Sequence, residues 1–202
     1  AVFCQQLHTG RWIVFHEIIG KDMGAIRFAE ILKREIAKNK WDHLTMKFIG
    51  DPAGNQMAQV SEHTPFMMLR ASGISAYPAP SNDISVRVEA VESVINRMAD
   101  GLPCLTVSPT CTSLISGFEG GYQFKRMYYM GNERYEEKPD KNRFSHCHDA
   151  LQYAFLGGGE GRRVMLGGQR PSTPTTVERA SNPFARLKRR NRDRDKGSVR
   201  AL

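Results

Sequence analysis

The sequence alternates between β-prone runs and amphipathic helical runs, and this alternation limits the fold more than any other feature. The runs "AVFCQQ" and "RWIVFHEII" are joined by "LHTG", which predicts an antiparallel hairpin that turns at Gly10. Residues 21–40 show the helical period, and residues 43–50 then alternate as a strand. The predicted inward positions are Ile26, Ala29, Leu32 and Ile36 in the helix, and Leu44, Met46 and Phe48 in the strand.

The second half repeats the alternation. Asn82 or Asp83 can cap a helix over residues 84–100, with Val88, Val91, Ile95 and Met98 on its inward side. "LPCLTVSP" predicts a short buried strand, "TSLISGFEG" a short helix, and "YQFKRMYYMGNERYEE" a hairpin that turns near residues 131–132. This order indicates an α/β domain with a mixed central β-sheet flanked by helices, and with a β-hairpin added before the last helix.

The last helix, "SHCHDALQYAFLGGG", places an acid beside its buried face. Ser145 is a predicted N-cap, and Asp149 borders the apolar stripe with His146 one turn before it and Tyr153 one turn after it. A carboxylate beside a core face is costly unless it is compensated, and a metal ion is one such compensation. The alternative is an acid that only complements the helix dipole. The predicted stripe consists of Cys147, Ala150, Leu151, Ala154 and Phe155.

Asp51 is a second candidate, because it ends a strand that helices flank in the sequence. Such a strand should lie centrally, and in open α/β sheets sites form at the carboxyl ends of strands. The adjacent Pro52 prevents the strand from continuing. The alternative is that "GDPAGN" is only a turn, since Asp, Pro, Gly and Asn are turn residues.

Asp51 and Asp149 suit a divalent ion if the fold brings them together. Carboxylate oxygens are ligands for Mg²⁺ or Mn²⁺, and a two-metal site of this kind can hydrolyse a phosphodiester. His146, on the helical face of Asp149, is a candidate ligand or general acid/base; the alternative is a histidine that contacts only solvent. The sequence has no GxxxxGK[ST], GxSxG or HExxH motif, which excludes the chemistries that those motifs carry.

The positive charge is concentrated at one end of the chain. Residues 1–161 hold 17 Lys and Arg against 18 Asp and Glu, whereas residues 162–202 hold 12 against 3, which gives the net charge of +8. We therefore predict a globular domain over residues 1–161 and a basic, disordered or partner-ordered tail over residues 162–202. Its basic run suits phosphate backbones, with Lys188, Arg189 and Arg190 as candidate nucleic-acid contacts. The alternative is a merely solvated tail.

Cysteine usage and hydropathy restrict the compartment. No apolar run approaches the ~18 residues of a membrane span, and no signal peptide opens the chain, so neither a membrane protein nor a secreted one is predicted. The four cysteines follow no CxxC pattern, which favours reduced and mostly buried thiols. A zinc site of Cys104, Cys111, Cys147 and His148 is an alternative whose ligand spacings fit no common structural site.

Three segments carry a family resemblance: "IGDPAGNQ", "GLPCLTVSPTC" and "KNRFSHCHDALQYAF". With the order of elements over residues 1–161, they resemble the nuclease domain of tailed-bacteriophage large terminase subunits. The resemblance implies an RNase H-like fold and a metal-dependent endonuclease that cuts concatemeric viral DNA during genome packaging. Asp51 matches the middle and Asp149 the last of the family's three acids. The first acid would stand just before Ala1, so we expect a fragment that lacks one metal ligand and part of its central strand.

The resemblance also implies partners and a compartment. Double-stranded DNA would be the substrate, with Lys141 and Arg143 as candidate contacts, and the portal and the small terminase subunit would be partners. The location would be the cytoplasm of the infected bacterial host. Two alternatives stay open: another RNase H-like nuclease of the resolvase or transposase type, and a catalytically impaired module that docks to the portal, a partner subunit or DNA.

Overall fold

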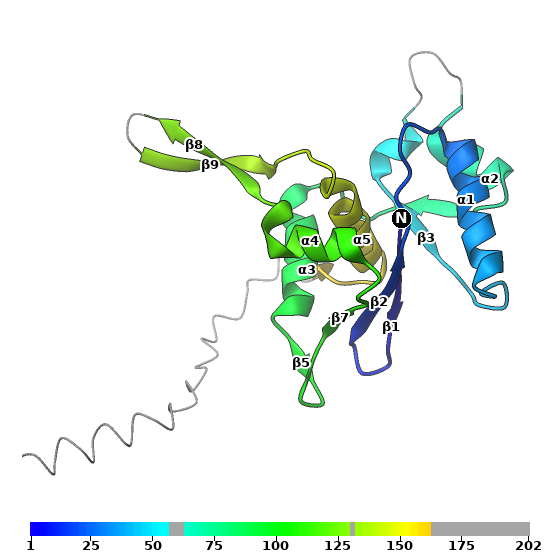
Figure 1. The fold of residues 1–202 in the computed structure, drawn as a ribbon, viewed down its shortest axis with the longest axis horizontal. Coiled ribbons are helices and arrows are strands. Elements are labelled where there is room, and N and C mark those ends of the chain that lie inside the picture. Colours follow the sequence, from blue (N-terminus) through cyan, green and yellow to red (C-terminus); the bar gives the residue numbers. More distant parts are fainter. Residues whose placement is uncertain (57–62, 130–131, 163–202) are drawn as a thin grey trace, which may run out of the picture. The chain divides into compact units, whose positions relative to one another are not determined.

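The computed structural model describes residues 1–56, 63–129 and 132–162. The chain divides into two units, Ala1–Gly168 and Gln169–Leu202, and the second lies outside the described residues. The described part is a mixed α/β structure, which confirms the predicted class (Figure 1). The predicted domain boundary after residue 161 stays a prediction.

The N-terminal strands form the predicted hairpin. β1 (Val2–Gln6) and β2 (Trp12–Glu17) are antiparallel, with Val2 opposite Glu17 and Gln6 opposite Trp12. The short strand β7 (Leu105–Val107) pairs with β2 in parallel. The resulting sheet has the order β1-β2-β7 and contains both strand directions, as the sequence predicted.

A separate parallel pair, β3 (Phe48–Gly50) and β4 (Ala76–Pro78), follows helix α1 (Ala25–Lys38). Helix α1 buries Ala29 and Leu32 as predicted, but Ile26 is exposed. Strand β3 begins later than predicted, and Leu44 is exposed as well. The reason is that the Leu44 amide donates to the Trp41 carbonyl at 2.9 Å, so the chain is still turning there. The 3-10 helix η1 (Pro52–Asn55) and helix α2 (Pro65–Ala71) lie between the two strands in sequence.

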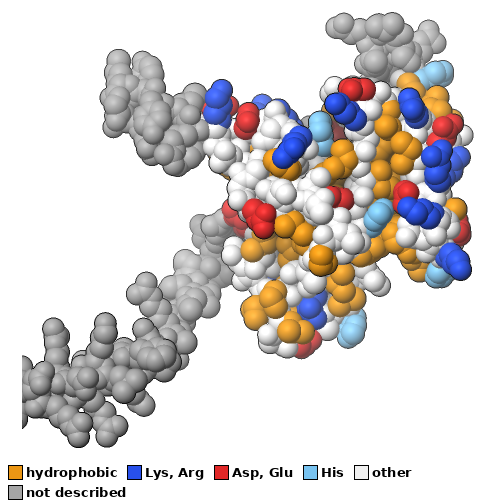
Figure 2. Space-filling model, in the orientation of Figure 1, with side chains coloured by type: hydrophobic (Ala, Val, Ile, Leu, Met, Phe, Trp, Pro, Cys, Tyr) orange, Lys and Arg blue, Asp and Glu red, His pale blue; other side chains and the backbone are white. Residues whose placement is uncertain are grey.

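Helix α3 (Ile84–Ile95) presents a different inward face from the predicted one. Asp83 is its N-cap, and its carboxylate accepts hydrogen bonds from the amides of residues 85 and 86. The helix ends at Ile95, which is exposed, and Met98 belongs to a small antiparallel pair, β5 (Met98–Ala99) with β6 (Leu102–Pro103). In Figure 2, hydrophobic side chains gather at this β5–β6 tip. The buried residues of α3 are Arg87, Ala90, Val91 and Val94.

The segment after β7 confirms the predicted helix and hairpin. Helix α4 (Thr112–Ser116) runs on into the π-helical turn η2 (Gly117–Gly121). The hairpin β8 (Phe124–Tyr129) and β9 (Asn132–Pro139) then projects away from the rest of the described structure (Figure 1). The predicted turn at residues 131–132 lies partly outside the described residues.

Helix α5 (Ser145–Gly157) contributes most to the core. It packs on α3 and on strands β1 and β3, and the Phe155 ring lies 4.6 Å from the Trp12 ring between centroids. The predicted stripe is confirmed: Cys147, Leu151 and Phe155 are buried. The predicted N-cap is wrong, because Ser145 is already helical. Instead, the Asn142 side chain accepts a hydrogen bond from the amide of residue 144 at 2.9 Å and so shapes the helix start.

An apolar groove of about 480 Å³ lies between β1 and the segment that leads into β3. Val2, Cys4, Phe48 and Ile49 line its sides, and Ala150 and Ala154 of α5 line it as well. Among the described strands, β1 pairs only with β2 and β3 only with β4. The predicted single central sheet is therefore two sheets, with β3 at an edge and not central.

The cysteines and the helix lengths agree with the sequence patterns. All four cysteines are free and three are buried, which confirms the prediction of reduced, mostly buried thiols. In the part of the chain that the structure describes, no helix is both long and apolar enough to cross a membrane.

Candidate functional site

Asp51 stands where the strand β3 ends and the turn η1 begins. Its Oδ1 atom accepts a hydrogen bond from the Ala53 amide at 2.8 Å, so Asp51 is the N-cap of η1. The turn rests on Phe66 of α2: a Cβ atom at Gly54 would come within 3.0 Å of that ring. The "GDPAGN" segment is therefore both a turn and a fixed platform that holds an exposed carboxylate at the end of a parallel strand.

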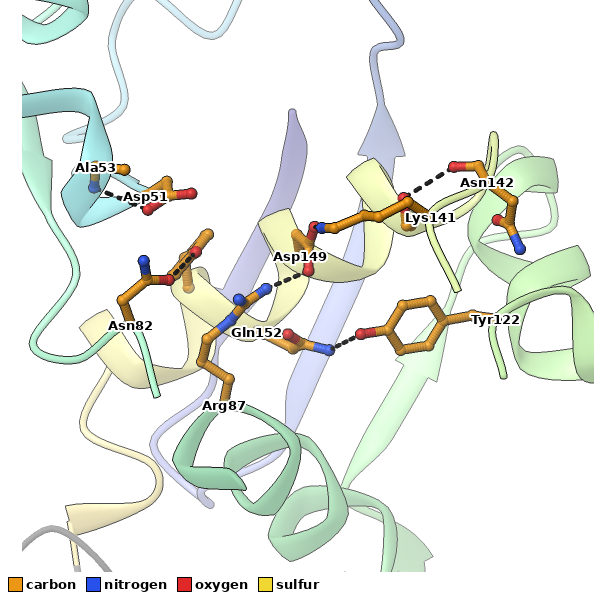
Figure 3. A network of polar contacts seen from close by, with 11 residues as sticks. Asp51, Ala53, Asn82, Arg87, Tyr122, Lys141, Asn142, Asp149 and Gln152 are labelled. Atoms are coloured by element: carbon orange, nitrogen blue, oxygen red, sulfur yellow. Dashed lines mark hydrogen bonds and ion pairs between the residues drawn. The ribbon is translucent and has the colours of Figure 1, made fainter. Parts of the chain in front are cut away.

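Asp149 lies on α5 between two cations, as Figure 3 shows. Arg87 Nη2 donates to its Oδ1 atom, and Lys141 Nζ donates to its Oδ2 atom at 2.8 Å. The Asp149 side chain is 17% exposed, Arg87 is 8% exposed, and Lys141 is 73% exposed. The largely buried carboxylate is thus compensated by one buried and one exposed cation.

Arg87 is held by more than its ion pair. Its guanidinium carbon lies 4.3 Å from the centroid of the Tyr153 ring, which is a cation–π contact. Its Nε atom is buried and has no hydrogen-bond partner among the described residues. Because burying a guanidinium is costly without an anion, the pairing of Arg87 with Asp149 is a structural requirement as well as a feature of the site.

Tyr153 lies one turn after Asp149 on α5. Its hydroxyl donates to Asn82 Oδ1 at 2.6 Å. Burial raises the pKa of Tyr153; Arg87 opposes this shift, and the nearby carboxylates of Asp51 and Asp149 add to it. Helix α5 packs against β3, which Asp51 follows, and Figure 3 shows the Asp51 side chain extending toward that helix.

A second network of polar and ring contacts involves the neighbouring face of α5. Gln152 donates to the Tyr122 hydroxyl at 2.9 Å, and the Tyr122 ring stacks on His148, with centroids 4.5 Å apart. The ring nitrogen Nε2 of His148 lies 3.2 Å from the Leu114 carbonyl. Burial lowers the pKa of His148, which keeps the ring neutral near pH 7. This histidine has a packing role.

His146 lies in the first turn of α5, one turn before Asp149. It is exposed and lines a cavity of about 270 Å³ with Ala1, Phe28 and Cys147, and neither acid lines that cavity. None of the hydrogen bonds or ion pairs found among the described residues joins it to Asp51 or Asp149. Its catalytic role stays a prediction.

The candidate nucleic-acid contacts divide into two groups. Lys141 and Arg143 are exposed beside the start of α5, and Arg143 lies over the Phe144 ring at 4.6 Å. Lys188, Arg189 and Arg190 lie outside the described residues.

The side chains at this site provide only some of the ligands that a divalent ion needs. Over the described residues, no group of three or more His, Cys, Asp and Glu side chains is arranged to hold a metal. The alternative zinc site of Cys104, Cys111, Cys147 and His148 therefore has no support from the arrangement of these side chains. Asp51 and Asp149 remain as the two candidate carboxylates, and Mg²⁺ binds proteins through one or two carboxylates while it keeps several of its waters.

Sequence patterns missed Arg87, the residue with the most contacts to this site. A signal was present, because Arg87 stands with Ala90, Val91 and Val94 at the spacing of a buried helical face. A charged residue in such a face needs an anion nearby. The sequence offers Asn82 only as a candidate helix cap. In the structure, its Oδ1 atom accepts a hydrogen bond from the Tyr153 hydroxyl.

No protein-family model matches the sequence, and neither a curated protein nor a solved structure matches it. The fold itself defines a mixed α/β protein in which α5, which bears Asp149, packs on β3, which Asp51 follows.

Proposed function

We propose that this chain is a divalent-metal-dependent endodeoxyribonuclease, corresponding to the nuclease domain of a phage DNA-packaging terminase. The observation that carries the proposal is that α5, which bears Asp149, packs against β3, at whose end Asp51 stands as an exposed N-cap. The two acids come from a strand end and from a late helix, almost a hundred residues apart in the sequence.

In this proposal the two carboxylates hold Mg²⁺ or Mn²⁺. Asp51 supplies an oxygen from the platform at the end of β3, and Asp149 supplies one from α5. A bound divalent ion activates water and stabilises the leaving oxygen of a phosphodiester. The protein's own cations act separately from the metal. Arg87 orients the Asp149 carboxylate, and the exposed Lys141 and Arg143 attract the DNA backbone.

The groove between β1 and β3 supports an RNase H-like arrangement. Its walls are two strands, each of which pairs on one side only among the described strands. An additional strand in this groove would hydrogen-bond to both neighbours and join the two sheets into one mixed sheet. The family resemblance implies that a further acid would lie on such a strand.

The remaining parts of the proposal rest on the resemblance alone. They are double-stranded DNA as substrate, the portal and the small terminase subunit as partners, and the cytoplasm of an infected bacterium as the location.

A catalytically impaired docking module is the second candidate. One observation favours it: both oxygens of Asp149 already have cationic partners, so this carboxylate is compensated without a metal. In a docking module, Asp149 would serve only to fix α3 against α5.

Metal binding distinguishes the two candidates. We expect the 202-residue chain to bind Mn²⁺ in calorimetric titration, and we expect Asp51→Asn and Asp149→Asn each to weaken that binding at least tenfold. Asp42→Asn, which removes an exposed acid outside the site, is the matched control and should bind like the parent. If the parent chain binds no Mn²⁺, or binds it equally well without Asp51 and Asp149, the docking module is the better description.

Cleavage is the second test. In a chain extended upstream by the acid-bearing strand, supercoiled plasmid should be nicked with Mn²⁺, and Asp51→Asn or Asp149→Asn should abolish nicking because losing either acid disables the whole site. His146→Ala should reduce the rate less. Near-parental nicking by Asp149→Asn would rule out a metal role for that residue.

A further inference from the structure

Asp149 is held by two cations of very different exposure to solvent. Arg87 is buried on helix α3, stacked on Tyr153 and paired with Oδ1. Lys141 stands in the loop before α5, with its side chain 73% exposed, and pairs with Oδ2. The two oxygens of one carboxylate therefore have a fixed partner and a loosely held partner.

The two ion pairs differ in the free energy needed to break them. Moving Arg87 would unstack it from Tyr153 and leave a guanidinium unpaired inside the protein, which is strongly unfavourable. Moving Lys141 exchanges one exposed ion pair for hydration of a flexible ammonium group, and exposed pairs contribute little to stability. Of the two Asp149 oxygens, only Oδ2 can therefore lose its cationic partner at a low cost in free energy.

We propose that Lys141 is an exchangeable counter-ion, which occupies Asp149 Oδ2 until a divalent cation displaces it. This inference rests on the proposed function, because it takes Asp149 as a metal ligand. Arg87 keeps Oδ1 in place throughout and sets the direction in which Oδ2 points. Lys141, once displaced, stays tethered beside the site at the start of α5, where its charge is available to a phosphate oxygen of a bound DNA strand.

The proposal predicts that removing the competitor strengthens metal binding. Lys141→Gln frees Oδ2 and removes a nearby positive charge, so Mn²⁺ affinity should rise by about two- to fivefold, as expected for the loss of one exposed ion pair. Lys141→Arg keeps the competing charge and should not raise the affinity. Lys125→Gln is the matched control, since Lys125 pairs with Glu136 of the β8–β9 hairpin and not with Asp149.

The experiment is calorimetric titration of Mn²⁺ into the full chain and these three variants at low ionic strength, with Asp149→Asn as the site control. A higher affinity in Lys141→Gln alone, lost again when Asp149→Asn is added, supports the proposal. An unchanged or lower affinity in Lys141→Gln, while the parent binds through Asp149, overturns the counter-ion role and leaves the proposed function intact. If neither the parent nor Lys141→Gln binds Mn²⁺, both this inference and the proposed function are wrong.

Discussion

Asp149→Asn tests whether the Arg87–Asp149 pair stabilises the fold, independently of any metal. The change keeps the size of the side chain and one hydrogen-bond acceptor but removes the negative charge. Arg87 would then be a buried guanidinium, 8% exposed, that faces a neutral amide. We therefore expect this variant to be less stable than the parent, in addition to losing metal binding.

The magnitude follows from the burial of the pair. Removing one partner of a fully buried ion pair destabilises a protein by about 3–5 kcal/mol, whereas an exposed pair contributes about 0–1 kcal/mol. Asp149 is 17% exposed and Asn retains an acceptor for Arg87, so we expect a loss of about 2 kcal/mol. For a domain of this size that corresponds to a decrease in Tm of roughly 4–8 °C.

A double-mutant cycle with Arg87→Met isolates the pair. Urea unfolding of the parent, the two single variants and the double variant gives the coupling free energy, which we expect to be about 1.5 kcal/mol. The double variant should be less destabilised than the sum of its parts, because it leaves neither charge unpaired. A coupling below about 0.5 kcal/mol would refute the buried-pair reasoning, since contacting charges in a buried site couple more strongly than that. The same free energies show whether Asp149→Asn is folded at the temperature at which its cleavage is measured.

Three other changes test separate features. Gly117→Ala should lower stability by about 1–3 kcal/mol in thermal unfolding, because a Cβ atom there would stand 1.9 Å from the His148 ring; no loss would show that the ring moves freely. Because burial lowers the pKa of His148, the unfolded state binds more protons, so stability should fall as the pH drops below about 6.5 toward the folded pKa. A His148→Gln variant should lose that part of the pH dependence in unfolding measured from about pH 7 to 5, and an unchanged profile would contradict it. Replacing the three cations at residues 188–190 with Gln should weaken DNA binding and flatten its salt dependence in fluorescence anisotropy, whereas an equal salt slope would exclude a phosphate contact there.

Local patterns predicted the longer elements correctly. The first hairpin, the helix that buries Ala29 and Leu32, and the stripe of α5 all follow from periodicity and turn residues. Short elements were predicted less consistently. Helix α2 and strand β4, of seven and three residues, were missed because so few residues show no clear period, whereas α4 and β7 lie within longer runs that gave a signal.

The sequence predicted the two acids of the candidate site but not the residues that surround them. The sequence pointed to Asp51 through its place at a strand end and to Asp149 through its place beside a buried stripe. It did not reveal Arg87 as the partner of Asp149, because the two residues lie on different helices, 62 positions apart. The predicted inward face of α3 consisted of Val88, Val91, Ile95 and Met98. Only Val91 of these is buried, and the prediction missed Arg87 on the buried face.

The sequence by itself determined the secondary structure of the long segments, the buried cysteines and the two candidate acids, because these depend on local periodicity, turn chemistry and composition. Only the tertiary structure decided what surrounds Asp149. A carboxylate beside a core face must be compensated, but periodicity cannot tell whether the compensating charge is a metal ion, a helix dipole or a side chain. The packing of α3 on α5 brings Arg87 onto the Tyr153 ring and against Asp149, and the loop before α5 places Lys141 on the other oxygen. Such contacts between distant segments arise only when the helices pack together.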